Sequence, residues 1–406
     1  MLSLARDRSR PRRPKSATLF LWDFTQQSAG ALSLPTGLTF ARASSGHTVR
    51  TGTSTITTSG ITSNDVGRIG RLSSSHNRGL FLEPARTNVY GYANTPGSAS
   101  GTAGSSGSTF TTGRTGPDGG TTATRIEQTS GTFSRYHSIT TAGASTPYTL
   151  SSWVAAGLGS GAYSMCAPYT GTSGAAITGT ATAAWARQSH TYTYPSTSGA
   201  NLVGEDGRAN GTSGAAAGAR DVDVAWIQFE VGSYPTSSIL TSAGATATRA
   251  AERLTIDSTR SAASVVSGRA GVYLRLRALA ASTELSTGEG WLLYWPDGDG
   301  GWYVDDATRS IYGYNGASES ETAAAAISWA RGDLLEFAIE CGAGTSSLRW
   351  RKNSGAVQTA SFSVHNDSWG SLDWSSGTDV CNVAGAGQFP AIVEQVATFA
   401  PGWGPM

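Results

Sequence analysis

The chain has 406 residues, of which 14% are charged, and its formal net charge is +1; ordinary globular chains contain about 25% charged residues. With 12 Trp, 14 Tyr and 11 Phe, it carries too much apolar surface for a disordered protein. The small net charge supplies no global field toward nucleic acid or a membrane. No apolar run reaches the roughly 18 residues that span a bilayer. We therefore expect no membrane span, and nucleic acid is not an expected partner.

Residues 1–16 form a basic N-terminal arm. Pro11 and Pro14 prevent a helix from running through it. A segment without a core of its own is ordered by a partner or remains solvated. One hypothesis is a docking arm that lies on an acidic neighbour or on nucleic acid, and the other is a solvated tail. The residues that would dock are Arg6, Arg8, Arg10, Arg12, Arg13 and Lys15.

At about 150 residues per domain, the length suggests two to three domains. Residues 17–255 contain short β-strand patterns between Gly-rich segments. We expect a β-rich attachment region over residues 17–93 and a β-sandwich over residues 94–255. Period-two alternation and turn residues predict strands. In the strand expected at 222–231, the alternation places Val222, Val224 and Trp226 on one face. The other strands are expected at 18–24, 38–43, 78–83, 121–126 and 148–154.

Residues 256–406 are expected to form a second antiparallel sandwich. Alternation predicts that Val272, Leu274 and Leu276 point inward. The clearest hairpin joins strands at 291–295 and 302–304 through the turn sequence PDGDGG. The single helix candidate is 319–331. The expected fold class is therefore all-β, an N-terminal arm followed by two antiparallel, jelly-roll-like β-sandwich domains.

Asp297 and Asp299 lie in that hairpin turn and allow three interpretations. Paired carboxylates suit glycoside cleavage, and hard oxygen ligands suit calcium. Asp is also a common residue of polar turns, and this third interpretation is favoured. The three cysteines are far apart, the histidines lack metal-site spacing, and no hydrolase or phosphate-binding motif occurs. We expect no enzyme activity, no metal and no cofactor.

Aromatic residues are concentrated in the C-terminal part of the chain. Sugars have an apolar face that stacks on aromatic rings, while polar side chains bind the surrounding hydroxyl groups. Most of these aromatic side chains are expected in the core. Trp302, Tyr312 and Tyr314 lie in or near turns, where binding residues tend to lie on a rigid sandwich. With Asp297 and Asp299, they are the candidate glycan-binding residues.

Six segments resemble, in the same order, segments of a recurring type of tailed-phage virion protein. LTFARAS at 38–44 is similar to TFTRAS, and RGLFLEPARTN at 78–88 to RGLLIEPARTN. PDG at 117–119, followed by TTATRI, is similar to PDGTTTA, and YTLSSWV at 148–154 to YTFSVWV. IQFEVGSYPTSS at 227–238 is similar to QLEAGSFPTSYI, and TRAAE at 248–252 to TRAADV.

The resemblance implies a structural protein of the virion, a tail fibre or head spike assembled in the host cytoplasm. It implies a carbohydrate-module-like sandwich over 94–255 and, less specifically, a concanavalin-like or laminin-G-like sandwich over 256–406. The expected partners are capsid, portal or tail proteins and further copies of this chain, with a trimer favoured. A host-surface glycan is the expected receptor. The alternatives are a decoration protein without a receptor and a glycan-depolymerising enzyme.

Overall fold

The structure is a computed structural model. It describes residues 18–26, 30–32, 36–41, 46–49, 58–61, 67–70, 76–77, 79–91, 93, 108–129, 133–140, 145–159, 161–169, 172–194, 200–206, 219–241, 244–263, 269–285, 290–295, 300–305, 308–315, 319–321, 327–342, 346–362, 377–381 and 388–399. Within these residues the chain is nearly all β, with antiparallel strand pairs, so the expected all-β class is confirmed. The arm at 1–16 lies outside the described residues, as do Asp297 and Asp299.

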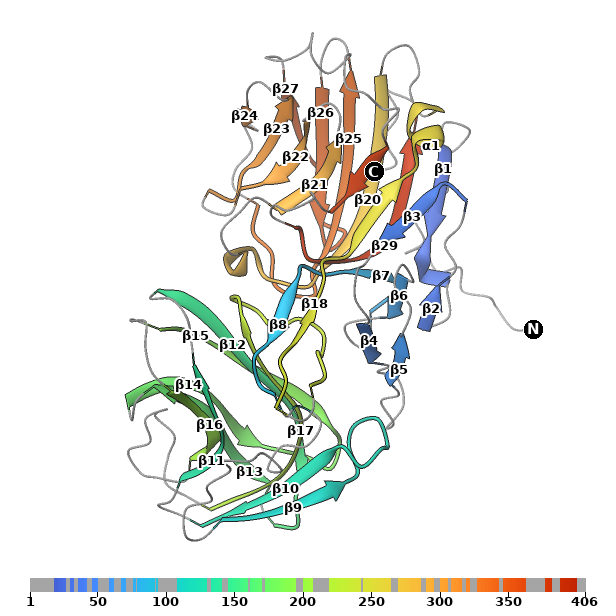
Figure 1. Cartoon of the computed structure of the whole chain (residues 1–406). Coiled ribbons are helices and arrows are strands. Elements are labelled where there is room, and N and C mark those ends of the chain that lie inside the picture. The colour runs from blue at the N-terminus through green and yellow to red at the C-terminus, as the bar shows by residue number, and fades with distance from the viewer. Residues whose placement is uncertain are drawn as a thin grey trace, which may run out of the picture.

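Two sheets form the upper half of the molecule in Figure 1, here called the terminal half. Sheet I contains, in spatial order, β2 (Gly30–Leu32), β6 (Gly67–Gly70), β7 (Gly79–Leu82), β29 (Ala391–Phe399), β20 (Arg269–Ala278), β25 (Leu334–Gly342), β26 (Ser346–Lys352) and β27 (Gln358–Phe362), with β1 (Thr18–Asp23) also paired to β29. Sheet II contains β24 (Glu319–Glu321), β23 (Ile311–Asn315), β22 (Gly300–Val304), β21 (Gly290–Trp295), β28 (Thr378–Val380), β19 (Arg253–Ile256) and β3 (Leu38–Ala41).

Apolar side chains from both sheets form one core in the terminal half. Val272, Leu274 and Leu276 of β20 are part of it, as the alternation predicted. Leu254 and Trp302 contribute from sheet II. The half also contains a small pair of strands, β4 (Gly46–Val49) and β5 (Thr58–Ile61), and the short helices η1 (Phe24–Gln26), η2 (Ser282–Glu284) and α1 (Ser258–Ala263).

Two further sheets form the lower half in Figure 1, here called the inserted half. Sheet III contains β15 (Ala186–Tyr194), β12 (Thr146–Ala156), β17 (Arg220–Val231), β10 (Ala123–Gln128), β9 (Ser108–Arg114), β8 (Arg86–Asn88) and β18 (Ala247–Arg249). Sheet IV contains β11 (Phe133–Thr140), β16 (Ala200–Asp206), β13 (Ala162–Tyr169) and β14 (Thr172–Thr180). The core of the inserted half includes Tyr90, Leu150, Met165 and Phe229.

The chain passes between the halves twice. It leaves sheet I after β7 and enters sheet III at β8, and it returns from β18 to β19 of sheet II. The two passages lie side by side, because β8 pairs antiparallel with β18. Residues 86–249 are thus an insertion within the terminal half.

The strand pairing differs from the domain division expected from the sequence. β1 and β7 are hydrogen-bonded to β29, and β3 to β19. The N-terminal strands therefore complete the sheets of the C-terminal part instead of forming a separate attachment region. Local patterns show that a strand exists, but they do not show its partner, which here lies hundreds of residues away.

Two local expectations are also corrected. No helix forms in the described residues of the range 319–331, because Glu319–Glu321 is β24 and residues 327–331 are not helical. The short helix α1 was not expected. Its first turn is capped by Asp257, whose carboxylate accepts a hydrogen bond from the Arg260 amide at 2.8 Å.

Trp226 departs from the predicted alternation. Val222 and Val224 lie in the core of the inserted half, whereas Trp226 lies in another cluster and packs edge-on against Trp153, with ring centroids 6.1 Å apart. Trp226 has a φ of 49°, and the register with β12 shifts between Ser151 and Trp153. This bulge moves the side chains that follow to the opposite faces.

The pairing of N-terminal and C-terminal strands gives a testable outcome. Phe24 is 1% exposed in the core of the terminal half. We expect Phe24→Ala to lower the free energy of unfolding by about 3–5 kcal/mol, since it leaves a cavity. Leu21→Ala, at a side chain 44% exposed, is the matched control and should change it by less than about 0.5 kcal/mol. Urea unfolding followed by tryptophan fluorescence measures both. Equal, small effects would contradict the shared core.

Candidate functional site

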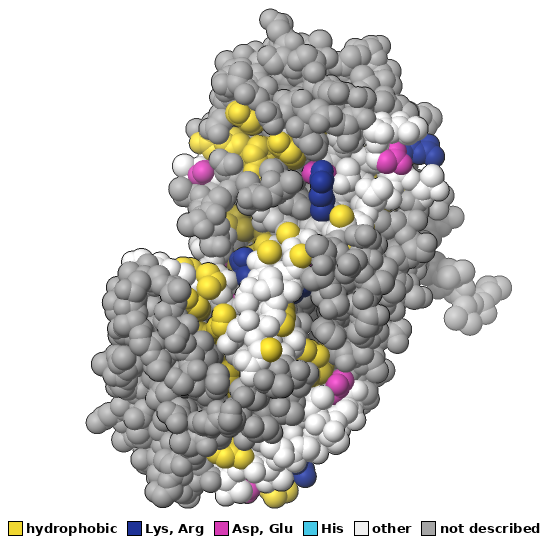
Figure 2. Space-filling view, viewed as in Figure 1, with side chains coloured by type: hydrophobic (Ala, Val, Ile, Leu, Met, Phe, Trp, Pro, Cys, Tyr) yellow, Lys and Arg dark blue, Asp and Glu magenta, His cyan; other side chains and the backbone are white. Residues whose placement is uncertain are grey.

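The outer face of sheet II carries a group of aromatic side chains, here called the aromatic face. Inward-pointing residues of β21, β22 and β23 reach the core, and the residues between them point outward. Apolar side chains are visible over these three strands in Figure 2. The aromatic face consists of Trp291, Tyr294, Tyr303, Tyr312 and Tyr314.

The rings of the aromatic face contact one another across the strands. Tyr303 and Tyr312 are directly opposite and stack with ring centroids 5.3 Å apart and an interplanar angle of 9°. Trp291 lies 4.9 Å from Tyr303 and meets Tyr314 edge-on at 6.4 Å. Trp291 and Tyr303 are buried, whereas Tyr312 and Tyr314 are half-buried. The two tyrosines of β23 therefore present aromatic surface to the outside.

Glycine permits this arrangement at one position. A Cβ atom at Gly301 would lie 2.5 Å from the Trp291 ring and 2.3 Å from the Leu293 carbonyl oxygen. Real Cβ atoms do not approach other atoms so closely, so a larger residue at 301 would displace the indole.

A polar strip follows the aromatic face on β28 and β19. Asp379 lies opposite Tyr294 on one side and Thr255 on the other. Its carboxylate accepts hydrogen bonds from Arg253 Nε at 2.8 Å and from Thr255 Oγ1 at 2.7 Å. Burial raises the pKa of Asp379, and the hydrogen bonds and charge from Arg253 oppose that rise. The Asp379 side chain is 0% exposed and the Arg253 side chain 37% exposed, so the strip holds a guanidinium in place at the surface. Aromatic rings and polar hydrogen-bonding groups are the two kinds of group that bind a sugar.

The structure brings together some of the expected site residues. Tyr312 and Tyr314 lie on one face of β23. The expectation that Trp302 is exposed is wrong: its side chain is 0% exposed in the core, and Nε1 donates to the Cys341 sulfur at 3.2 Å. Trp302 alternates with outward-facing Tyr303, so the period of the strand places it inside. Asp297 and Asp299 cannot be placed, because they lie outside the described residues.

Sequence reasoning missed Trp291 and Tyr303 as members of the face. The run at 291–295 is wholly apolar, so no alternation distinguishes its two sides. The register with β22 also shifts between Trp291 and Leu293, which places two consecutive residues, 292 and 293, in the core. Tyr303 could have been found from its position opposite Tyr312 if the pairing had been known.

Charged residues also gather on the outer side of sheet I. Arg275 Nε lies 3.0 Å from Glu394, and Arg351 Nε lies 2.6 Å from Glu336. Burial alone would raise the pKa of Glu336, but hydrogen bonds from Arg351 and Tyr273 outweigh it and hold that pKa below its usual value. Glycoside cleavage needs an acid with a raised pKa. Glu336 therefore does not suit that role, and its contacts tie neighbouring strands together.

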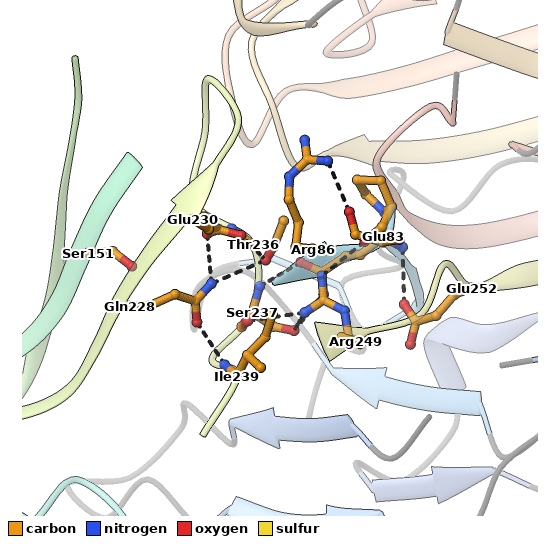
Figure 3. Close-up of polar contacts among 12 residues, drawn as sticks. Glu83, Arg86, Ser151, Gln228, Glu230, Thr236, Ser237, Ile239, Arg249 and Glu252 are labelled. Atoms are coloured by element: carbon orange, nitrogen blue, oxygen red, sulfur yellow. Dashed lines mark hydrogen bonds and ion pairs between the residues drawn. The ribbon is translucent and has the colours of Figure 1, made fainter. Parts of the chain in front are cut away.

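The two chain passages meet in a buried polar network, here called the junction (Figure 3). Glu83, which follows β7, lies 3.2 Å from Arg249 of β18, and both side chains are 3% exposed. The Glu83 carboxylate also accepts hydrogen bonds from the amide and hydroxyl of Ser237, at 2.8 and 2.5 Å. The amide of Glu83 donates to the Glu252 carboxylate at 3.0 Å. The carboxylate of Glu83 thus ties its own segment to β18 and to the loop that carries Ser237.

The loop after β17 closes on itself beside that pair. Glu230 accepts hydrogen bonds from the amide of Thr236 at 2.8 Å and from Gln228 Nε2 at 2.7 Å. Gln228 Oε1 accepts from the Ile239 amide at 2.7 Å. Arg187 donates a hydrogen bond to the Thr236 carbonyl oxygen at 2.5 Å, and burial lowers the pKa of Arg187 to about 10. These contacts fix the loop that supplies Ser237 to Glu83.

No family model matches the sequence, and no curated protein matches it. Within the described residues, the helices are too short to cross a membrane. That same part of the chain contains no group of three or more His, Cys, Asp or Glu side chains arranged to hold a metal ion. Cys341 and Cys381, both described, are buried thiols outside any disulfide, and burial raises the pKa of Cys381.

The junction predicts a large effect from a small change. Glu83→Gln leaves the buried guanidinium of Arg249 without its counter-charge, so we expect the free energy of unfolding to fall by about 3–5 kcal/mol. The control is Lys352→Met, since Lys352 is 41% exposed and lies 4.0 Å from Asp333; its loss should cost less than about 1 kcal/mol. Chemical denaturation measures both. A Glu83→Gln protein as stable as the control would contradict the role given to the pair.

Proposed function

We propose that this protein is a structural component of a tailed-phage virion, a surface appendage that binds a glycan of the host surface through its aromatic face. The observation that carries the binding role is the pair of half-buried rings, Tyr312 and Tyr314, on β23 of a rigid sheet. The polar strip lies on the same sheet, beyond β22 and β21, where Asp379 is opposite Tyr294. Aromatic faces flanked by fixed polar groups suit sugars, because each sugar ring has an apolar face and a rim of hydroxyl groups.

The virion role rests on the ordered resemblance of six segments to tailed-phage virion proteins. Three of those segments, at 78–88, 227–238 and 248–252, supply the side chains of the junction. These junction residues hold the inserted half to the terminal half, so a chain with this architecture requires them. We infer that the inserted half is a carbohydrate-module-like sandwich and the terminal half a concanavalin-like or laminin-G-like one.

In this proposal the chain has one docking end and one receptor-binding surface. The arm residues Arg6 to Lys15 attach the protein to an acidic patch of a capsid, portal or tail protein. Sheet II presents the aromatic face outward. Binding on a rigid sheet keeps the rings in place before the ligand arrives, which reduces the entropy lost on binding.

Glycan binding is tested by substitution on β23. We expect Tyr314→Ala or Tyr312→Ala to weaken binding to host-surface polysaccharide at least about tenfold, a loss of about 1.4 kcal/mol, in a protein that remains folded. Tyr192→Ala, at a half-buried tyrosine of β15 in the inserted half, is the matched control and should bind normally. Isothermal titration with the purified polysaccharide measures affinity. Equal affinity in all three variants would contradict a binding role for the aromatic face.

The virion role is tested on particles. Gold-labelled antibodies against this chain should bind purified virions at a repeated position, seen by electron microscopy. Serine substitutions at Arg6, Arg8, Arg10, Arg12 and Arg13 should remove the label while the folded protein accumulates free, since the arm then lacks charge. Virions without label would contradict the proposal. Labelled virions that adsorb normally with Tyr314→Ala would indicate a decoration protein without a receptor.

A further inference from the structure

Trp291 and Gln388 lie side by side at the edge of the aromatic face. They form an isolated parallel β-bridge, beyond the point where β28 pairs with β21. Paired residues of neighbouring strands direct their side chains to the same side of a sheet. Gln388 is therefore directed to the outer side with Trp291, which places an amide next to an indole ring whose other neighbours are tyrosines.

Within the described part of the chain, each of these two side chains has a buried polar atom without a hydrogen-bond partner. The atoms are Nε1 of Trp291, a donor, and Oε1 of Gln388, an acceptor. The other end of the Gln388 amide is occupied, because Nε2 donates to the Glu252 carbonyl oxygen at 2.8 Å. That bond fixes which end of the amide is the acceptor. Buried polar groups without partners are uncommon, and each one calls for a physical reason.

A hydroxyl group satisfies both atoms at once. It accepts a hydrogen bond from Nε1 through its oxygen and donates its own hydrogen to Oε1. Saccharides carry hydroxyl groups next to an apolar ring face, and the rings of Tyr303 and Tyr314 lie beside Trp291. A protein partner would have to supply a hydroxyl side chain at the same depth, whereas every pyranose presents several.

We infer that the aromatic face takes a neutral saccharide and that one sugar hydroxyl binds between Trp291 Nε1 and Gln388 Oε1. This inference rests on the glycan binding proposed above and adds its specificity. The pair then discriminates against sugars that lack this hydroxyl, because a deoxy sugar leaves both atoms unsatisfied.

The test separates the hydrogen bond from the ring. Trp291→Phe keeps an aromatic ring and removes the Nε1 donor, and Gln388→Leu removes the acceptor at similar size. We expect each change to weaken binding of the host polysaccharide about fivefold to tenfold, the effect of one lost hydrogen bond. The melting temperature of Trp291→Phe should fall less than that of Trp329→Phe, because both changes remove buried ring volume but the Trp291 donor has no partner to lose. Titration calorimetry and thermal unfolding provide the two readouts.

Trp329→Phe is the matched control. Its buried Nε1 donates to the Ala280 carbonyl oxygen at 2.9 Å, so this change should lower the melting temperature and leave affinity unchanged. The effects of Trp291→Phe and of a deoxy sugar should not add, because both remove the same bond.

The outcomes distinguish this inference from the proposed function. If the unaltered protein binds no saccharide from a panel of host-surface glycans, the proposed function fails. If Tyr314→Ala weakens binding while both Trp291→Phe and Gln388→Leu leave affinity unchanged, the inference fails and the aromatic face stands. That second result would assign the site between the two atoms to a water molecule. Should Trp291→Phe not fold, the affinity of Gln388→Leu decides the question.

Discussion

The buried ion pair between Glu83 and Arg249 is the interaction on which the architecture depends. The chain crosses between its halves only at β8 and β18 within the described residues, and this pair lies where the two passages meet. A buried carboxylate without its counter-charge is costly, so the passages cannot separate without a large loss of free energy. The pair therefore converts two thin connections into one rigid joint, and the Ser237 loop completes the coordination of the carboxylate.

The junction is also linked to the aromatic face through a single residue, Glu252. Glu252 receives a hydrogen bond from the Glu83 amide through its carboxylate, and its carbonyl oxygen accepts from Gln388 Nε2. Arg253, the next residue, forms the ion pair with Asp379 beside Tyr294. The strand that returns from the inserted half thus becomes β19, and its first residues position both the polar strip and the amide next to Trp291. Architecture and proposed recognition share the same few residues of chain.

The sequence allowed the strands to be predicted but not their partners. Alternation in β20 identified the inward side of Val272, Leu274 and Leu276 correctly, because that strand is regular. The same reasoning failed at Trp226, where a positive φ reverses the faces of the strand. It also placed Trp302 outside, because the residue was assigned from its proximity to a turn instead of from the alternation of the strand, which places it inside. Tyr312 and Tyr314 were named from their position near turns, and they lie on the aromatic face. Trp291 and Gln388 were not named, since their proximity arises from a bridge between segments almost a hundred residues apart.

The central claim is that the outer side of sheet II receives a sugar while the remainder of the fold supports it. A crystal structure of the full chain soaked with an oligosaccharide from the host surface tests this claim most directly. The account predicts a pyranose ring over Tyr312 and Tyr314, with a hydroxyl between the indole nitrogen of Trp291 and the amide of Gln388. Sugar density on the inserted half, with the aromatic face empty, would contradict it.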